Sequence, residues 1–266
     1  MDGRARERFK IALLTFACGA AAVALTAIEC FAQVADGAAA QTPASAVTPS
    51  TNAAIAAPAT APNPQVIEAG DLFLAGSRVY IFVQKTGLGH EHGVVGLIKQ
   101  GRIDLNAARD SGGLVFDMAS FSADTPDARK YVGLEGETDA STQQQVNANM
   151  RGTDVLNVGK FPTATFVIKQ IGKLDKPSQR GLPQYQLTGD FTLHRITKPI
   201  QVVADAEDQG PWIHLRGGFT MLQTTFGMTP FTKAFGAVGV ADQLNVYGDL
   251  WISKQRQVAQ RGTTTR

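Results

Sequence analysis

Cysteine is nearly absent from this sequence of 266 residues. The two cysteines, Cys18 and Cys30, both lie in an apolar stretch near the N-terminus. If that stretch is removed, the rest of the chain has no disulfide, no thiolate nucleophile and no cysteine-ligated metal. A body without cysteine is compatible with an oxidising compartment.

An excess of one charge is lacking as well. The chain has 25 lysines and arginines against 23 aspartates and glutamates, for a net charge of +2. A nucleic-acid surface would need a basic stripe with interleaved aromatic residues, so we expect no nucleic-acid partner. The sequence also contains no Gly-x-Ser-x-Gly elbow, phosphate loop or His-Glu-x-x-His helix. We therefore predict a protein that is not an enzyme.

The N-terminus has the pattern of an export signal. Four basic residues occur in the first ten, and residues 11–28 are uncharged and apolar or small. Ala32 precedes Gln33 at a plausible cleavage site. We predict a signal peptide over residues 1–32 and a periplasmic or secreted protein. The alternative is an uncleaved anchor, which would keep the protein near a membrane, since the apolar run is close to the lower limit for a span.

Composition divides the remaining chain into three parts. Residues 33–66 are dominated by alanine, proline and threonine, and such a segment cannot bury enough apolar surface to offset its ordering entropy. We predict a disordered linker there, one folded domain over residues 67–254, and a flexible basic tail over residues 255–266.

The folded domain alternates between apolar and polar residues. Strict alternation indicates strands with one buried and one solvated face, whereas parallel sheets favour continuous apolar runs. Glycine-rich turns separate about eight such stretches. The predicted strands span residues 77–86, 92–105, 113–122, 163–174, 184–194, 197–207, 212–222 and 242–254.

The predicted fold class is all-β: a lipocalin-like, eight-stranded antiparallel β-barrel with a short helical insertion between strands 3 and 4. Eight strands can close around one small ligand. Alternation does not distinguish a hollow lumen from a solid core. The residues expected to face inward are Val79, Ile81, Val83, Phe166, Ile168, Tyr185, Leu187, Phe191, Leu193, Ile213, Leu215, Phe219, Met221, Leu244, Val246 and Leu250.

The insertion covers residues 124–160, where alternation stops. We predict a short helix over residues 127–131 and a second over residues 141–151, with Ser141 as its N-cap. Val146 and Met150 are four residues apart and would face the barrel. The insertion would either cap one mouth of the barrel or serve only as a packing element.

Several motifs resemble the YceI-like polyisoprenoid-binding family. The run VLNVGKFPTATF at residues 155–166 is similar to the family's run that leads through Lys-Tyr-Pro into a strand. The run LTGDFTLHRITKPI at residues 187–200 resembles its Thr-Gly-Asp hairpin. Asp124 and Thr125, with Arg129, look like the family's helix start. The resemblance covers about residues 75–254.

The resemblance implies a barrel that holds a polyisoprenoid lipid in an apolar tunnel, with no cofactor beyond that lipid. The expected function is non-catalytic binding or transport of such a lipid, and a quinone would be one example. The assembly state, including a homodimer, stays open. The alternative is a barrel with a solid core that binds a metal or a partner at its rim.

That alternative depends on the histidines. His90 and His92 form a His-x-His pair after a Leu-Gly step, whereas many relatives have one histidine before it. Such a pair within a strand is common in zinc and copper sites. His194 lies in a turn expected at the same end of the barrel. We assign no metal site and keep these three as candidates, because they would equally cap turns or contact a lipid head group.

Overall fold

The computed structural model describes residues 66–258. The predicted signal peptide, the linker up to residue 65 and residues 259–266 of the tail lie outside this range. The elements are β1 (Val66–Ile67), β2 (Arg78–Gly87), β3 (His92–Ile103), β4 (Gly112–Ala123), α1 (Pro126–Tyr131), α2 (Ala140–Arg151), β5 (Thr163–Lys173), β6 (Gln184–Leu193), β7 (Ile196–Gln209), β8 (Trp212–Leu222), η1 (Thr224–Phe226), β9 (Thr232–Lys233), η2 (Ala234–Gly236), β10 (Val238–Ser253) and β11 (Gln257–Val258).

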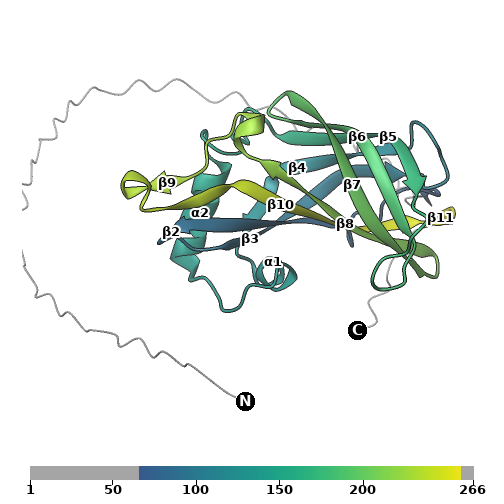
Figure 1. Ribbon diagram of the computed structural model, residues 1–266, viewed down its shortest axis with the longest axis horizontal. Helices are drawn as coiled ribbons and strands as arrows, with labels where there is room; N and C mark the ends of the chain where they lie inside the picture. The colour runs from purple at the N-terminus through teal and green to yellow at the C-terminus, as the bar shows by residue number, and fades with distance from the viewer. Residues whose placement is uncertain (1–65, 259–266) are drawn as a thin grey trace, which may run out of the picture. The chain divides into compact units, whose positions relative to one another are not determined.

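Eight long antiparallel strands form a closed barrel (Figure 1). The strand order is β2-β3-β4-β5-β6-β7-β8-β10, and β10 pairs with β2 as well as with β8. Asn245 lies opposite Thr220 of β8 on one side and Phe82 of β2 on the other. Closure leaves the eight-strand sheet without an open edge, as the predicted fold class requires.

The predicted strands agree closely with the observed ones, and the fold class is confirmed. The largest difference is at β10, which begins at Val238 instead of residue 242. Its register against β2 shifts between Val240 and Leu244. This irregularity interrupts the period-two pattern, so the first residues of the strand do not alternate clearly in the sequence.

Two short strands, β1 and β11, lie at the two ends of the described residues. Val66, assigned to the linker, and Val258, assigned to the tail, pair with each other in the β1–β11 ribbon. The amide of Gly70 donates to the carbonyl of Ser253 at 2.8 Å, so the segments that flank the barrel run side by side. Local composition does not reveal such a pairing, since its two strands are about 190 residues apart in sequence.

Two helices form between β4 and β5, as predicted. Thr125 caps α1 by accepting a hydrogen bond from the Ala128 amide at 3.2 Å. For α2 the predicted cap was wrong. Asp139, and not Ser141, accepts from the Thr142 amide, and the Ser141 hydroxyl donates to the same carboxylate. An aspartate is a strong N-cap, and it begins the helix one residue earlier.

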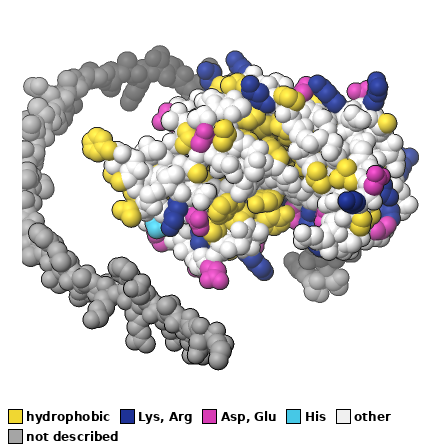
Figure 2. All heavy atoms as spheres, viewed as in Figure 1, with side chains coloured by type: hydrophobic (Ala, Val, Ile, Leu, Met, Phe, Trp, Pro, Cys, Tyr) yellow, Lys and Arg dark blue, Asp and Glu magenta, His cyan; other side chains and the backbone are white. Residues whose placement is uncertain are grey.

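Within residues 66–258, the helices are too short or too polar to cross a membrane. In the space-filling view, hydrophobic side chains gather in the middle of the visible face, and charged side chains lie mostly around its margin (Figure 2).

Candidate functional site

The barrel is hollow. A first cavity of about 120 Å³ lies among strands from all sides of the barrel. Every residue that lines it is apolar or a glycine. Its size is comparable to engineered apolar cavities that stay dry and bind a benzene ring. Phe191 contributes to one wall, and its ring makes edge contacts with Phe116, Phe219 and Phe226 at centroid distances of 5.4 to 6.3 Å.

A second cavity of about 130 Å³ continues the first toward helix α2. Five residues line both cavities: Ile81, Phe121, Leu156, Met228 and Leu244. The two spaces are therefore parts of one elongated lumen. The second part differs chemically because three polar side chains, His92, Asn149 and Gln223, contribute to its wall. The lumen is thus entirely apolar in its first part, and its polar side chains lie in the second part, which we call its polar end.

A pair of glycines explains part of the empty volume. Gly217 of β8 and Gly248 of β10 lie opposite each other in register, and both line the first cavity. Two neighbouring strands therefore contribute no side chain at this level of the barrel. The flanking inward residues of β10, Val246 and Leu250, are buried. A larger residue at Gly248 would project into space that the structure leaves unfilled, whereas a Cβ at Gly217 would meet the Val203 carbonyl.

Helix α2 closes a gap in the wall beside the second cavity. Strand β4 pairs with β5 only from Gly112 to Asp117, so the last part of β4 lacks a neighbouring strand on that side. Side chains of α2 take its place. Gln143 donates to the Ala123 carbonyl at 3.0 Å, and Asn147 accepts from the Ala123 amide at 2.8 Å. Arg151 donates to the Phe121 carbonyl at 2.8 Å.

These three side chains are spaced four residues apart and therefore share one face of the helix. The adjacent face carries Val146 and Met150, which line the second cavity. Both face the barrel interior, as the sequence predicted. Helix α2 is thus a section of the lumen wall. It offers hydrogen bonds to the strand and apolar side chains to the cavity.

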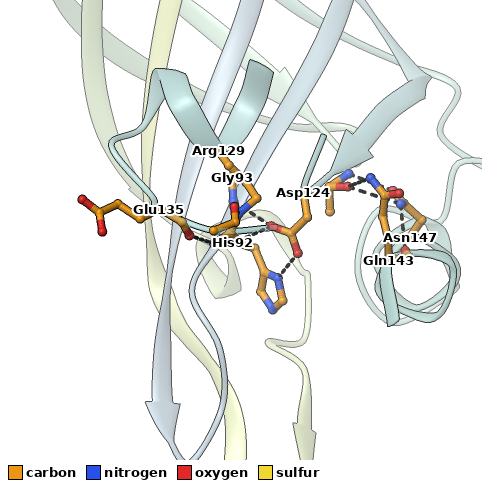
Figure 3. Close-up of polar contacts among 9 residues, drawn as sticks. His92, Gly93, Asp124, Arg129, Glu135, Gln143 and Asn147 are labelled. Atoms are coloured by element: carbon orange, nitrogen blue, oxygen red, sulfur yellow. Dashed lines mark hydrogen bonds and ion pairs between the residues drawn. The ribbon is translucent and has the colours of Figure 1, made fainter. Parts of the chain in front are cut away.

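A buried carboxylate connects the start of β3 with helix α1 (Figure 3). Asp124 is 4% exposed and has a φ of 56°. One of its oxygens, Oδ2, lies 2.7 Å from Nδ1 of His92. The other, Oδ1, accepts from the Gly93 amide at 3.2 Å and from Arg129 at 3.3 Å. Both oxygens are satisfied, as a buried carboxylate requires.

The charge of this carboxylate is stabilised by its partners. Burial by itself would raise the pKa of Asp124. The hydrogen bond and charge of His92 act in the opposite direction, and so do the Gly93 amide and Arg129. Their combined effect is larger, and the pKa of Asp124 lies below its ordinary value of 3.8. The carboxylate therefore holds a proton on Nδ1 of His92 and fixes the orientation of the ring.

The family assignment follows from a match over most of the barrel. The model of the YceI-like domain matches residues 73–250. This chain belongs to the YceI-like family. The YceI-like signature runs that lead into β5 and form the β6–β7 hairpin both lie within the matched range.

Individual relatives match this chain over only part of its length. A UPF0312 protein of Shewanella oneidensis is 36% identical over 115 residues, which are 42% of this chain and 56% of that protein. A UPF0312 protein of Azotobacter vinelandii is 33% identical over 103 residues, 38% of this chain and 50% of its own length. The chain therefore spans about half the length of the curated relatives that it matches.

Solved structures of similar shape have low sequence identity. BcnA of Burkholderia cenocepacia has a TM-score of 0.48 and 19% identity, over 69% of this chain and all of that one. A domain from Saccharophagus degradans, described as a polyisoprenoid binding domain implicated in plant cell wall breakdown, has a TM-score of 0.47 and 13% identity. That match covers 72% of this chain and 99% of the other.

Most residues predicted to face the lumen of this YceI-like barrel do so. All but three of them line the first or the second cavity. Ile168 is 1% exposed and belongs to the packed core. Tyr185 and Ile213 are partly buried against that core and line neither cavity. Alternation identifies the face of a strand and not the depth at which the lumen lies, so it does not separate these three residues from those that line a cavity.

Many lumen residues were missed by the sequence reasoning. They come from β3 and β4, the insertion, the start of β5, the middle of β7, and the segment that leads from β8 into β10. Their apolar character is their only signal in the sequence, and it does not show where in the barrel they lie. The missed residues include Val94, Ile103, Leu114, Phe116, Met118, Phe121, Ala123, Val155, Leu156, Ala164, Ile200, Val202, Ala204, Met228, Phe231 and Val240.

The histidines of the YceI-like chain are not brought together. Nε2 of His194 lies 2.8 Å from the Leu156 carbonyl, and its ring stacks on Phe161 at a centroid distance of 4.5 Å. His92 is engaged with Asp124, and His90 is exposed. Across residues 66–258, no three histidine, cysteine, aspartate or glutamate side chains are grouped so that they could hold a metal ion. The geometry therefore does not support a shared metal site.

Proposed function

We propose that this chain is a non-catalytic binding protein that carries an apolar, polyisoprenoid-type lipid inside its barrel. The observation that carries the proposal is the lumen formed by the two adjoining cavities, the first of which is lined only by apolar residues and glycines. Burial of a hydrocarbon chain stabilises a complex by about 0.8 kcal/mol for each methylene. A long, unbranched or isoprenoid chain matches an elongated dry lumen better than a compact polar metabolite does.

Membership of the YceI-like family supports the same ligand class, because the sequence motifs resemble those of polyisoprenoid-binding proteins. The lining also argues for binding without chemistry. Among the described residues, the polar side chains at the lumen are His92, Asn149 and Gln223. None of them is paired with a nucleophile, and Asp124 holds His92 from outside the cavity wall.

The proposed place of action is the periplasm or the space outside the cell. The support is the basic and then apolar pattern of residues 1–32. N-terminal sequencing of the protein from fractionated cells tests it. A chain that begins at Gln33 in the soluble extracytoplasmic fraction is the expected result. A full-length chain in the membrane fraction would favour the uncleaved anchor, and a full-length chain in the cytoplasm would refute export.

Native mass spectrometry of gently purified protein tests the bound lipid. We expect a mass above that of the polypeptide, which disappears after organic extraction, and an extract that contains an isoprenoid. Tandem fragmentation then distinguishes a quinone from another polyprenyl lipid, and the same spectrum reports a monomer or a homodimer. Repeated spectra of ligand-free protein from the native host, together with failure to take up added isoprenoids, would contradict the proposal.

The alternative of a rim site on a solid core gains no support from the structure. The core is not solid, since the two cavities occupy its centre. His90, His92 and His194 also do not converge. This alternative would regain support if protein purified without an affinity tag contained stoichiometric zinc or copper and if His90→Ala lost that metal.

A further inference from the structure

The polar end of the lumen contains one side chain with an unused hydrogen-bonding atom. His92 lines the second cavity, and its side chain is 14% exposed. Nδ1 is committed to Asp124 at 2.7 Å. Nε2 has no hydrogen-bond partner within residues 66–258. Because the two nitrogens lie on different edges of the ring, the interaction with Asp124 leaves Nε2 available to a ligand (Figure 3).

A second acceptor lies in the same wall. Gln223 is 3% exposed, and its side-chain amide donates to the Ala241 carbonyl at 2.8 Å. This hydrogen bond fixes the amide group and leaves Oε1 as an acceptor. Both groups border an otherwise largely apolar space, where an unmatched polar atom is costly. A ligand that supplies the missing hydrogen bonds there would bind more tightly than a pure hydrocarbon.

The charge of the lining restricts what that ligand group can be. No lysine or arginine among the described residues lines either cavity. Two arginines lie close to this end and are already engaged: Arg129 with Asp124 and the backbone carbonyl of Gly136, and Arg151 with the backbone carbonyl of Phe121. A diphosphate inside the lumen would therefore be buried without a full counter-charge, which is strongly unfavourable. The lining favours a neutral group.

We propose that the polar end of the lumen binds the hydroxyl head of a neutral isoprenoid alcohol, with Nε2 of His92 as its hydrogen-bond partner. The inference rests on the proposed function and specifies the head group. With Nδ1 protonated, neutral His92 presents a lone pair on Nε2, and a hydroxyl donates to it. If His92 is fully protonated, the hydroxyl oxygen accepts instead. A carbonyl or an ether satisfies only the second state. The hydrocarbon tail would extend past Leu244 toward Gly248.

Three ligands with one carbon skeleton test the proposal: farnesol, farnesyl methyl ether and farnesyl diphosphate. Delipidated full-length mature protein is loaded with N-phenyl-1-naphthylamine, and displacement of the dye is followed by fluorescence at neutral pH. We expect farnesol to bind roughly fivefold more tightly than the ether, the ratio that corresponds to one neutral hydrogen bond. The diphosphate is expected to bind most weakly.

His92→Asn is the decisive variant. Asparagine retains an N–H that can reach Asp124 in place of Nδ1, but it has no equivalent of Nε2. We expect the farnesol-to-ether ratio to fall to about one, as the loss of that single hydrogen bond requires. Val146→Ala, which alters an apolar residue of the same cavity, is the matched control. It should weaken both ligands equally and leave the ratio unchanged.

The outcomes separate this inference from the proposed function. Equal binding of farnesol and its ether to the unaltered protein, or a ratio that survives in His92→Asn, overturns the head-group assignment while lipid binding stands. Tightest binding of the diphosphate also overturns it. If none of the three ligands displaces the dye, the proposed function fails, and the head-group assignment fails with it.

Discussion

Gly248 offers a direct way to fill the lumen without disturbing its wall. A Cβ built on Gly248 would have Leu250 Cγ as its nearest neighbour, at 3.6 Å, which is an ordinary contact. Its partner Gly217 is unsuitable, because a Cβ there would lie 2.4 Å from the Val203 carbonyl oxygen. The change Gly248→Leu therefore places four carbons in the cavity and leaves the backbone intact.

The expected loss of affinity follows from the hydrocarbon that leucine displaces. If four ligand carbons are excluded at about 0.8 kcal/mol each, binding weakens by about 3 kcal/mol. This corresponds to a dissociation constant roughly 100-fold higher. The protein without ligand should be as stable as the unaltered protein or more stable. Leucine fills an apolar void and replaces a glycine within a strand, and changes of both kinds commonly stabilise by about 0.5 to 2 kcal/mol.

Two measurements on the same samples test this reasoning. Dye displacement by farnesol gives the affinity, and thermal unfolding of the delipidated protein gives the stability. Gly172→Leu is the matched control, because Gly172 lies in β5, is exposed, and has nothing within 4 Å of a built Cβ. The control should keep its affinity. Unchanged affinity in Gly248→Leu, with the protein folded, would show that the ligand does not occupy this lumen.

Three further predictions concern residues of the insertion between β4 and β5. Asn147→Ala removes the side chain that pairs with both backbone groups of Ala123 and should lower the free energy of unfolding by about 1 to 3 kcal/mol in urea. Gln144→Ala, on the exposed face of the same helix, should change it by less than about 0.5 kcal/mol, and equal effects would refute the role of α2 as an edge partner. Because the folded-state pKa of Asp124 is lowered, its contribution to stability should be present above about pH 4 and lost as pH falls further. Urea midpoints between pH 3 and 6 should show this loss in the unaltered protein and a weaker one in Asp124→Asn, and parallel pH profiles would contradict it. Burial, and secondarily the carboxylate of Asp249, raises the pKa of Tyr131 to about 12. The stability that this phenol contributes is therefore present below about pH 10 and lost as pH rises toward 12. In an absorbance titration at 295 nm, Tyr131→Phe should lack one late-ionising tyrosine, and an unchanged curve would refute the assignment.

The strands could be predicted because one physical pattern determines them. In β6, for example, Leu187, Gly189, Phe191 and Leu193 are buried, while the residues that alternate with them are more exposed. A half-buried antiparallel strand requires this period of two. The loss of this alternation over residues 124–160 indicated the position of the insertion. Both inferences use information that is local in the sequence.

The lumen could be predicted only in part, because its shape depends on pairings that are distant in sequence. The register between β3 and β4 shifts twice, between Val95 and Leu97 and between Ile98 and Gln100. Each irregularity changes which face a residue occupies, and the inward residues of β4 were missed accordingly. The empty volume was also invisible, because it depends on Gly217 and Gly248 meeting in register. Each glycine alone resembles any other glycine in a strand.

The chemistry of the polar end also depends on a contact that is distant in sequence. The pair His90 and His92 is conspicuous in the sequence, and it suggested a metal because neighbouring histidines commonly bind one. The partner that decides the chemistry of His92 is Asp124, 32 residues away. A carboxylate on Nδ1 makes the ring a fixed hydrogen-bonding group in an apolar wall and gives it no second ligand for a metal. The helix that continues that wall begins at Ala140, with Asp139 as its N-cap. The insertion between β4 and β5 therefore supplies both the carboxylate that orients His92 and the helix that encloses the cavity beside it, whereas the rest of the barrel supplies the apolar tunnel.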